Sequence, residues 1–179
     1  ASKESGLPEG IPVLYRAVDQ PNNALSLNAF KPGEIAATGG TSGVVYAITD
    51  SPKTKESLRI NNFAHVNYTK ELPVIGKLLN INGAGILYSW MQQNIAGSED
   101  SYHDMNKLAA SVPIGSDGLT ILPFGNGAER MLHNESKGAR MSNLNFNVHQ
   151  KEHLFRAALE GIAFSFVYGI TILKSDGVD

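Results

Sequence analysis

The sequence predicts an α/β fold in which a mixed sheet is flanked by helices. Three observations lead to this class: short apolar runs in the first half of the chain, two helical patterns between residues 83 and 112, and a long helical pattern near the C-terminal end. The 179 residues are enough for one domain with a hydrophobic core. Strands interrupted and followed by helices are typical of such layered folds.

The chain opens with a polar stretch and a strand-like run. Residues 1–10 are polar and are interpreted as a tail or linker, which assigns residues 11–179 to the domain. Residues 11–19, IPVLYRAVD, are apolar enough for a buried strand that ends on the carboxylate of Asp19. A short helix is expected over residues 20–30, because a proline stands close to its start.

Two strands are expected to meet at a glycine-rich turn. Residues 36–48, AATGGTSGVVYAI, place the turn 39–43 between two apolar runs, as in a β-hairpin. Consecutive amides in a glycine turn also bind anions, and the missing side chains let a phosphate approach the backbone. The residues alone leave both interpretations open. Two more strands are expected over residues 58–68 and 72–82.

The first of the later helices is expected to begin near Gly83. Its pattern places Ile86, Trp90 and Ile95 roughly on one face, and Gly97 closes it. A helix start made of small residues offers N–H groups and the positive end of the helix dipole to a phosphate. Close helix packing explains the same small residues, and it is the more common reason for them.

The remaining chain adds a helix, a strand, a polar segment and the longest helix. Residues 98–112 begin with Ser, Glu and Asp, as helix N-termini do. Residues 118–125, GLTILPFG, predict a buried strand, and residues 126–147 predict a loop that is functional or ordered by a partner. The longest helix is expected over residues 149–177. The residues with helical spacing are Met105, Leu108, Ala109 and Val112 in the shorter helix, and Leu154, Ala158, Ile162, Ser165, Tyr168 and Ile172 in the longer one.

Composition excludes several classes of function. The net charge of −2 gives no reason to expect nucleic acid or an anionic membrane as a partner. The chain has no Cys, which excludes disulfides, thiolate nucleophiles and Cys-based metal sites and fits the cytoplasm. We expect no membrane span, because no uninterrupted apolar run approaches about 20 residues.

A few side chains are candidates for chemistry. Asp19 ends an expected strand, where sites gather in open α/β sheets, although a helix cap or Asx-turn is the more common reason for a carboxylate at such a position. His149 and His153 have metal-ligand spacing, but no third ligand is evident and a solvated helix start is favoured. Glu129 and Arg130 are interpreted as an ion pair or a loop anchor rather than a catalytic pair.

Four segments in fixed order resemble the FGGY carbohydrate kinase family, most closely its xylulokinases. Residues 15–48 carry the Asp19 segment and the Gly-Thr-Ser-Gly turn. Residues 119–134, LTILPFGNGAERMLHN, are similar to the family's Leu-Pro…Gly-Glu-Arg…His segment. Residues 153–166, HLFRAALEGIAFSF, are similar to its Arg-Ala-x-Leu-Glu-Gly helix.

The resemblance implies one half of an actin-like (ribonuclease H-like) ATPase, in which residues 11–179 would be part of the C-terminal, nucleotide-binding domain. The implied reaction is ATP-dependent phosphorylation of a sugar hydroxyl, with D-xylulose as the expected acceptor and Mg²⁺ on the phosphates. The family's N-terminal domain would be the partner and would lie before residue 1, a homodimer is a candidate assembly, and this segment alone is expected to be inactive. A kinase for ribulose or glycerol, or an actin-like nucleotide-binding module without sugar chemistry, is the alternative.

The same resemblance assigns roles to individual residues. Asp19 would be the general base, and Asp19 and Gln20 would contact the sugar. Gly40, Thr41 and Ser42 would hold the ATP phosphates, with Thr41 and the Gly40 amides nearest the developing charge. Gly85 would let the nucleotide approach the helix that follows it.

Overall fold

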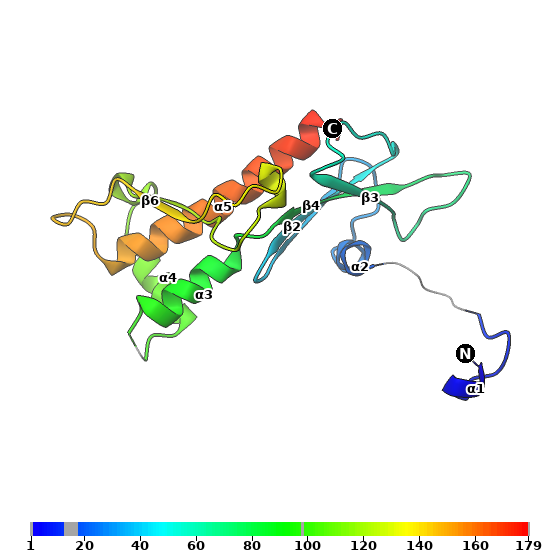
Figure 1. The fold of residues 1–179 in the computed structure, drawn as a ribbon, viewed down its shortest axis with the longest axis horizontal. Coiled ribbons are helices and arrows are strands. Elements are labelled where there is room, and N and C mark those ends of the chain that lie inside the picture. Colours follow the sequence, from blue (N-terminus) through cyan, green and yellow to red (C-terminus); the bar gives the residue numbers. More distant parts are fainter. Residues whose placement is uncertain (1, 13–17, 98, 179) are drawn as a thin grey trace.

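The fold consists of a four-stranded sheet with a short helix on one face and a long helix on the other (Figure 1). The computed structural model describes residues 2–12, 18–97 and 99–178. Most of the strand expected over residues 11–19 lies outside this part of the chain. The helices are α1 (Ser2–Ser5), α2 (Asp19–Ser26), α3 (Gly85–Asn94), α4 (Tyr102–Ala110) and α5 (Lys151–Ser175), with 3₁₀ turns at Ser116–Gly118 and Arg130–Leu132. The strands are β1 (Ile35–Gly39), β2 (Gly43–Thr49), β3 (Ile60–Ala64), β4 (Ile75–Ile81), β5 (Thr120–Leu122) and β6 (Arg140–Ser142).

The main sheet has the strand order β1-β2-β4-β3. The expected hairpin is confirmed, because β1 and β2 pair antiparallel and Gly39 faces Gly43 across the turn. The strands β3 and β4, expected over residues 58–68 and 72–82, are also present. The α/β class is confirmed, but every strand pair in the described part of the chain is antiparallel, which differs from the mixed sheet that we expected.

Both faces of the sheet are covered near its centre, so all seven residues of β2 are buried. Tyr46 and Leu78 lie on one face and pack in a cluster with Ala24 of α2. Successive strand side chains point to opposite faces, so Val45 and Leu79 lie on the other face and pack with residues of α5. Burial on both faces explains why β2 reads as an unbroken apolar run rather than an alternating one.

A second hydrophobic cluster joins α3, α4 and α5. Met105 and Phe155 are fully buried in it, together with Leu87, Tyr88 and Met91 of α3. The predicted face of α3 is only partly correct: Ile95 packs against this cluster, but Trp90 is 49% exposed, and the buried side chains are those of Leu87, Tyr88 and Met91. α3 carries apolar residues on two faces, and packing against α4 and α5 selects the one that the spacing did not indicate.

The expected helices α4 and α5 and the expected strand β5 are present, with two corrections: β5 is buried only at Ile121, and Tyr168 of α5 is exposed. α4 begins with a capping box in which Ser101 and Asp104 satisfy each other's backbone N–H groups, as the polar start of that segment indicated. The segment expected as a loop, residues 126–147, contains β6, which pairs antiparallel with β5 and forms a two-stranded sheet. Three-residue strands leave almost no periodicity to detect in a sequence.

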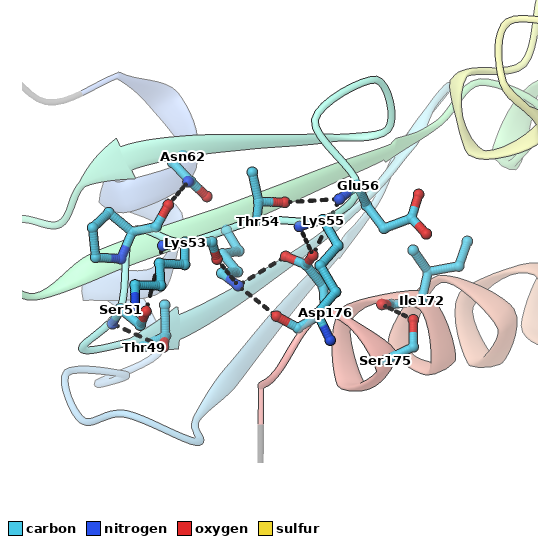
Figure 2. Close-up of polar contacts among 12 residues, drawn as sticks. Thr49, Ser51, Lys53, Thr54, Lys55, Glu56, Asn62, Ile172, Ser175 and Asp176 are labelled. Carbon is cyan, nitrogen blue, oxygen red and sulfur yellow. Dashed lines mark hydrogen bonds and ion pairs between the residues drawn. The ribbon is translucent and has the colours of Figure 1, made fainter.

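A buried ion pair fastens the end of α5 to the sheet (Figure 2). Lys77 Nζ lies 2.8 Å from Asp176 Oδ2 and also donates to the carbonyl oxygens of Lys53 and Asp176. The other carboxylate oxygen, Asp176 Oδ1, accepts the N–H groups of Lys55 and Glu56. Burial alone would raise the pKa of Asp176, but the hydrogen bonds from Lys77 and from the backbone outweigh it and lower that pKa.

By length and composition α5 is apolar enough to cross a membrane, although its apolar residues are interrupted by polar ones and so form no uninterrupted run. A core helix of a water-soluble protein has the same properties. α5 contributes Phe155, Ala158 and Leu173 to the two large hydrophobic clusters, and all three side chains are fully buried. One stripe of the same helix, around Phe164 and Val167, is exposed.

Candidate functional site

The glycine turn between β1 and β2 is docked on the first residues of α3. The carbonyl oxygen of Gly40 accepts the N–H of Gly85 at 3.0 Å, and the carbonyl oxygen of Thr41 accepts the N–H of Ile86 at 3.0 Å. A further hydrogen bond inside the turn runs from the N–H of Gly40 to the carbonyl oxygen of Ser42. The turn and the helix start therefore form one rigid unit.

This docking sets the direction of the remaining turn amides. A trans peptide holds its N–H opposite its C=O, so the N–H groups of Thr41 and Ser42 point away from α3. Neither amide donates to another residue in the described part of the chain. Neighbouring N–H groups that point to the same side are the kind of donors that bind anions, so the hairpin does not exclude the phosphate-loop interpretation of the same residues.

Two details of the expected phosphate contacts need correction. The Gly40 amide is already bonded to Ser42, so it is not free for an anion, whereas the Thr41 and Ser42 amides donate to no residue in the described part of the chain. The N–H groups of Gly85 and Ile86 are also occupied, so the start of α3 does not offer them to a phosphate. A Cβ at residue 85 would collide with the Gly40 carbonyl oxygen, so close packing explains this glycine.

Glu129 binds backbone N–H groups just before the same helix start and in its own loop. Its carboxylate is buried, with Oε2 accepting the N–H of Gly83 at 3.0 Å and Oε1 accepting the N–H of Met131 at 3.3 Å. Of the two earlier alternatives, the loop anchor is correct, because no ion pair joins Glu129 to Arg130 among the described residues. Arg130 reaches β3 instead.

Asp19 and Gln20 lie at the N-terminus of α2, beside a hollow of about 350 Å³. Both residues line it, together with Asn61 and Phe63 of β3 and with Asn80 of β4. Asp19 is exposed, as an acid that meets a ligand from solvent must be.

The hollow opens close to the glycine turn. Asn80 pairs with Val44 across β2 and β4, and the next pair along the same strands is Gly43 with Ile81. The residues predicted as base and as phosphate contacts are thus brought to one end of the sheet. No sequence motif indicates Asn61 and Asn80 as site residues. Only the register of β3 and β4 shows that both side chains lie on the face of the sheet that lines the hollow beside Asp19.

The histidine pair has a structural role. His149 Nδ1 accepts the N–H of Asn145, and its Nε2 lies 3.2 Å from the Asp117 carbonyl oxygen. His153 Nδ1 accepts the N–H of Gln150, and its Nε2 lies 3.2 Å from a carboxylate oxygen of Asp117. Residues 2–12, 18–97 and 99–178 contain no group of three or more acidic or histidine side chains that could hold a metal ion.

Comparison with known proteins supports the resemblance seen in the motifs. No protein-family model matches the sequence. The chain is 34% identical to a gluconokinase of Bacillus subtilis over 98% of its own length and 35% of the relative's. It is 29% identical to a xylulose kinase of Haemophilus influenzae, over 97% of the chain and 33% of the relative.

Solved structures agree with the sequence matches. A xylulose kinase from Rhodospirillum rubrum superimposes on 99% of the chain with a TM-score of 0.82 at 26% identity, and the match covers 34% of that enzyme. These relatives and this solved structure, which match the α/β domain, are named as sugar and sugar-acid kinases. The chain is thus similar to a segment of FGGY carbohydrate kinases, as its motifs indicated. It spans about a third of the length of the relatives that it matches.

Proposed function

We propose that the full-length protein transfers the γ-phosphate of ATP to a hydroxyl group of a sugar or sugar acid. The observation that carries the proposal is the shared location of an exposed carboxylate, Asp19, and two outward turn amides at one end of the sheet. Phosphoryl transfer depends mainly on positioning and on stabilising charge, and these two features serve those two needs.

Asp19 would accept the proton of the attacking hydroxyl as the alcohol bonds to phosphorus. The Thr41 and Ser42 amides, together with the Thr41 hydroxyl, would hold phosphate oxygens and the charge that develops on them. Gln20 would position the acceptor from the same end of α2. The donors found here suit an anion, so Mg²⁺ would take its ligands mainly from the phosphates and would neutralise part of their charge.

The position of the chain within the family suggests how the site is completed. Residues 11–179 would form part of the C-terminal, nucleotide-binding domain, with residues 1–10 as a linker. The N-terminal domain would form the other wall of the acceptor site, and domain closure would exclude water, which otherwise competes as an acceptor. Such a metabolic enzyme would work in the cytoplasm, alone or as a homodimer.

Two acceptors have support, and they differ in charge. D-Xylulose is expected from the motifs, and the R. rubrum relative is named a xylulose kinase. Gluconate is added because the relatives with 34% identity are named gluconokinases. Ribulose and glycerol remain the further acceptors of the same class.

The test is a panel of acceptors with the purified full-length protein. ADP release is followed with gluconate, D-xylulose, ribulose, glycerol or no acceptor, each with ATP and Mg²⁺. We expect one acceptor to raise ADP release far above the rate without acceptor, and mass spectrometry to identify its phosphorylated product. ATP hydrolysis that no acceptor increases would favour the actin-like module without sugar chemistry and would overturn the proposal.

A further inference from the structure

We propose that Asn61 and Asn80 bind hydroxyl groups of the acceptor, and that Arg130 orients the Asn61 amide for this contact. The inference rests on the proposed kinase function and deepens it. The substrate class that it implies is a polyhydroxylated chain or ring long enough to reach β3 and β4 while one hydroxyl meets Asp19.

The first support is the position of the two side chains. Asn61 pairs with Leu78, and Asn80 lies two residues further along β4, so both amides project from the same face of the sheet. That face is apolar where α2 covers it, around Tyr46 and Leu78. Beyond the cover of α2 the same face changes to amides, and these line the hollow next to Asp19.

The second support is the state of the amides themselves. No residue in the described part of the chain forms a hydrogen bond with the side chain of Asn80, although this side chain is half-buried. A half-buried amide carries two donors and an acceptor that favour polar partners. Hydroxyl groups, which donate and accept, match an amide better than a carboxylate or a cation does.

The third support is the contact between Arg130 and Asn61. Arg130 donates from NH2 to Asn61 Oδ1 at 2.7 Å and from Nε to the carbonyl oxygen of Arg59 at 3.2 Å. The guanidinium is thereby fixed at both ends, and its bond to Oδ1 holds the Asn61 amide in one orientation. The Nδ2 group of Asn61 is then the part of the amide that remains to donate to an acceptor hydroxyl.

The experiment uses the full-length protein and the acceptor that gives turnover with wild type. Asn61→Ala and Asn80→Ala are expected to raise KM for that acceptor about three- to tenfold each, as the loss of a hydrogen bond to a neutral group does. The effect is expected in KM for the acceptor rather than in KM for ATP, because both amides line the hollow beside Asp19. Asn62→Ala is the matched control, since Asn62 lies next to Asn61 on the opposite face and bonds to the Pro52 carbonyl oxygen.

Arg130 is tested as a positioning residue. Arg130→Met is expected to raise KM for the acceptor by less than Asn61→Ala does. In the Asn61→Ala background the same change is expected to add nothing to KM, because the amide that it orients is gone. A role of Arg130 in folding alone predicts additive effects in the double variant and a lower midpoint of thermal unfolding.

The outcomes separate the two proposals. If wild type phosphorylates an acceptor but Asn61→Ala and Asn80→Ala keep its KM, the amide proposal is overturned and the kinase function stands. If wild type phosphorylates no acceptor, both are overturned. Should an alanine variant fail to fold, Asn80→Ser and Asn61→Ser replace it, since serine keeps a polar group while shortening its reach, and they too must raise KM.

Discussion

The two carboxylates of the candidate site differ in burial: Asp19 is exposed and Glu129 is buried, and each environment suits the role proposed for that residue. Asp19 is exposed at the mouth of a hollow, where an acceptor can reach it. Glu129 is buried and has both oxygens engaged by backbone N–H groups. A carboxylate that moves a proton must meet its substrate, whereas one that fixes the backbone does best without competing water.

Replacement of Asp19 tests the proposed base. In the full-length protein, Asp19→Asn keeps the shape of the side chain but removes its ability to take a proton. We expect kcat to fall by about 10²–10⁴-fold, as for loss of a general base, with ATP binding retained. The measurements are steady-state kinetics and ATP affinity by calorimetry.

Asp50→Asn is the matched control for this change. Asp50 is exposed and follows β2 at the end opposite the glycine turn, so its replacement is expected to leave kcat unchanged. Near-normal turnover of Asp19→Asn would show that another group accepts the proton.

Replacement of Glu129 tests whether the helix start supports the turn. Glu129→Gln leaves one oxygen, so one of the two N–H groups that Glu129 now accepts would face an amide NH₂. An unsatisfied buried N–H costs about 1–3 kcal/mol. We therefore expect a lower midpoint of thermal unfolding and, because Gly83 leads into the helix that holds the turn, a severalfold higher KM for ATP.

The control for Glu129 comes from the same loop. Glu135 is exposed and pairs with Lys137, so Glu135→Gln is expected to change neither the unfolding midpoint nor KM for ATP. A Glu129→Gln enzyme that matches wild type in both measurements would contradict the supporting role.

At the scale of elements, α5 is held at two places by different means. Along its length it packs against the sheet and against α3 and α4 by apolar contacts. At its C-terminal end the Lys77–Asp176 pair ties it to β4 and to the segment between β2 and β3 (Figure 2). The pair fixes one relative placement of helix and sheet, which apolar packing alone specifies less sharply.

Removal of one partner from this pair is expected to be costly. Lys77→Met leaves the Asp176 carboxylate buried without its cation, and such a loss typically destabilises a protein by about 3–5 kcal/mol. We expect a clearly lower midpoint of thermal unfolding. Adding Asp176→Asn removes the uncompensated charge and keeps an oxygen for the N–H groups of Lys55 and Glu56, so it is expected to restore part of the loss.

The matched control is Lys174→Met, which removes an exposed lysine from the last turn of the same helix. It is expected to leave the midpoint close to that of wild type. A Lys77→Met protein as stable as wild type, or a double variant less stable than the single one, would argue against a compensated buried pair.

What the sequence indicated about elements depended on the strength of local signals. The glycine turn, the acidic and serine-rich segment before α4 and the long apolar period of α5 are local, and each predicted its element correctly. The buried face of α3 depended on what it packs against, so its two apolar faces could not be distinguished. The three-residue strand β6 carries too little pattern to be recognised.

The residues of the candidate site also differ in whether a local motif or long-range packing reveals them. Asp19, Thr41 and Ser42 stand in short motifs, so they were named from the sequence. Asn61 and Asn80 join them only through the register of β3, β4 and β2, which depends on contacts between distant parts of the chain. The motif also does not reveal that the Gly85 N–H is occupied by the docked turn, or that the Gly40 N–H is occupied by Ser42 within the turn.

At the scale of the molecule, the chain leaves apolar side chains uncovered. Phe164, Val167 and Tyr168 form an exposed stripe on α5, and Phe164 is 66% exposed. The relatives are about three times as long as this chain, and we propose that this stripe contacts the rest of the enzyme.

Expression of residues 1–179 alone tests the stripe. We expect this segment to self-associate at micromolar concentration, because exposed apolar patches promote association. Phe164→Ser with Val167→Ser is expected to shift it toward the monomer in sedimentation velocity. Thr171→Ser, on the same exposed side of α5, is the control and is expected to leave association unchanged. A monomeric segment with the native stripe would contradict the assignment.

The burial of Lys77 also makes this residue a chemical reporter. Its ammonium group has a side-chain exposure of 1% and is engaged by three oxygen atoms, so an amine-directed reagent cannot reach it while α5 is seated. Exposed lysines such as Lys70 and Lys107 are open to the same reagent. Pulse labelling followed by peptide mass spectrometry would therefore measure the labelling rate of Lys77, and this rate reports how often the end of α5 detaches from the sheet.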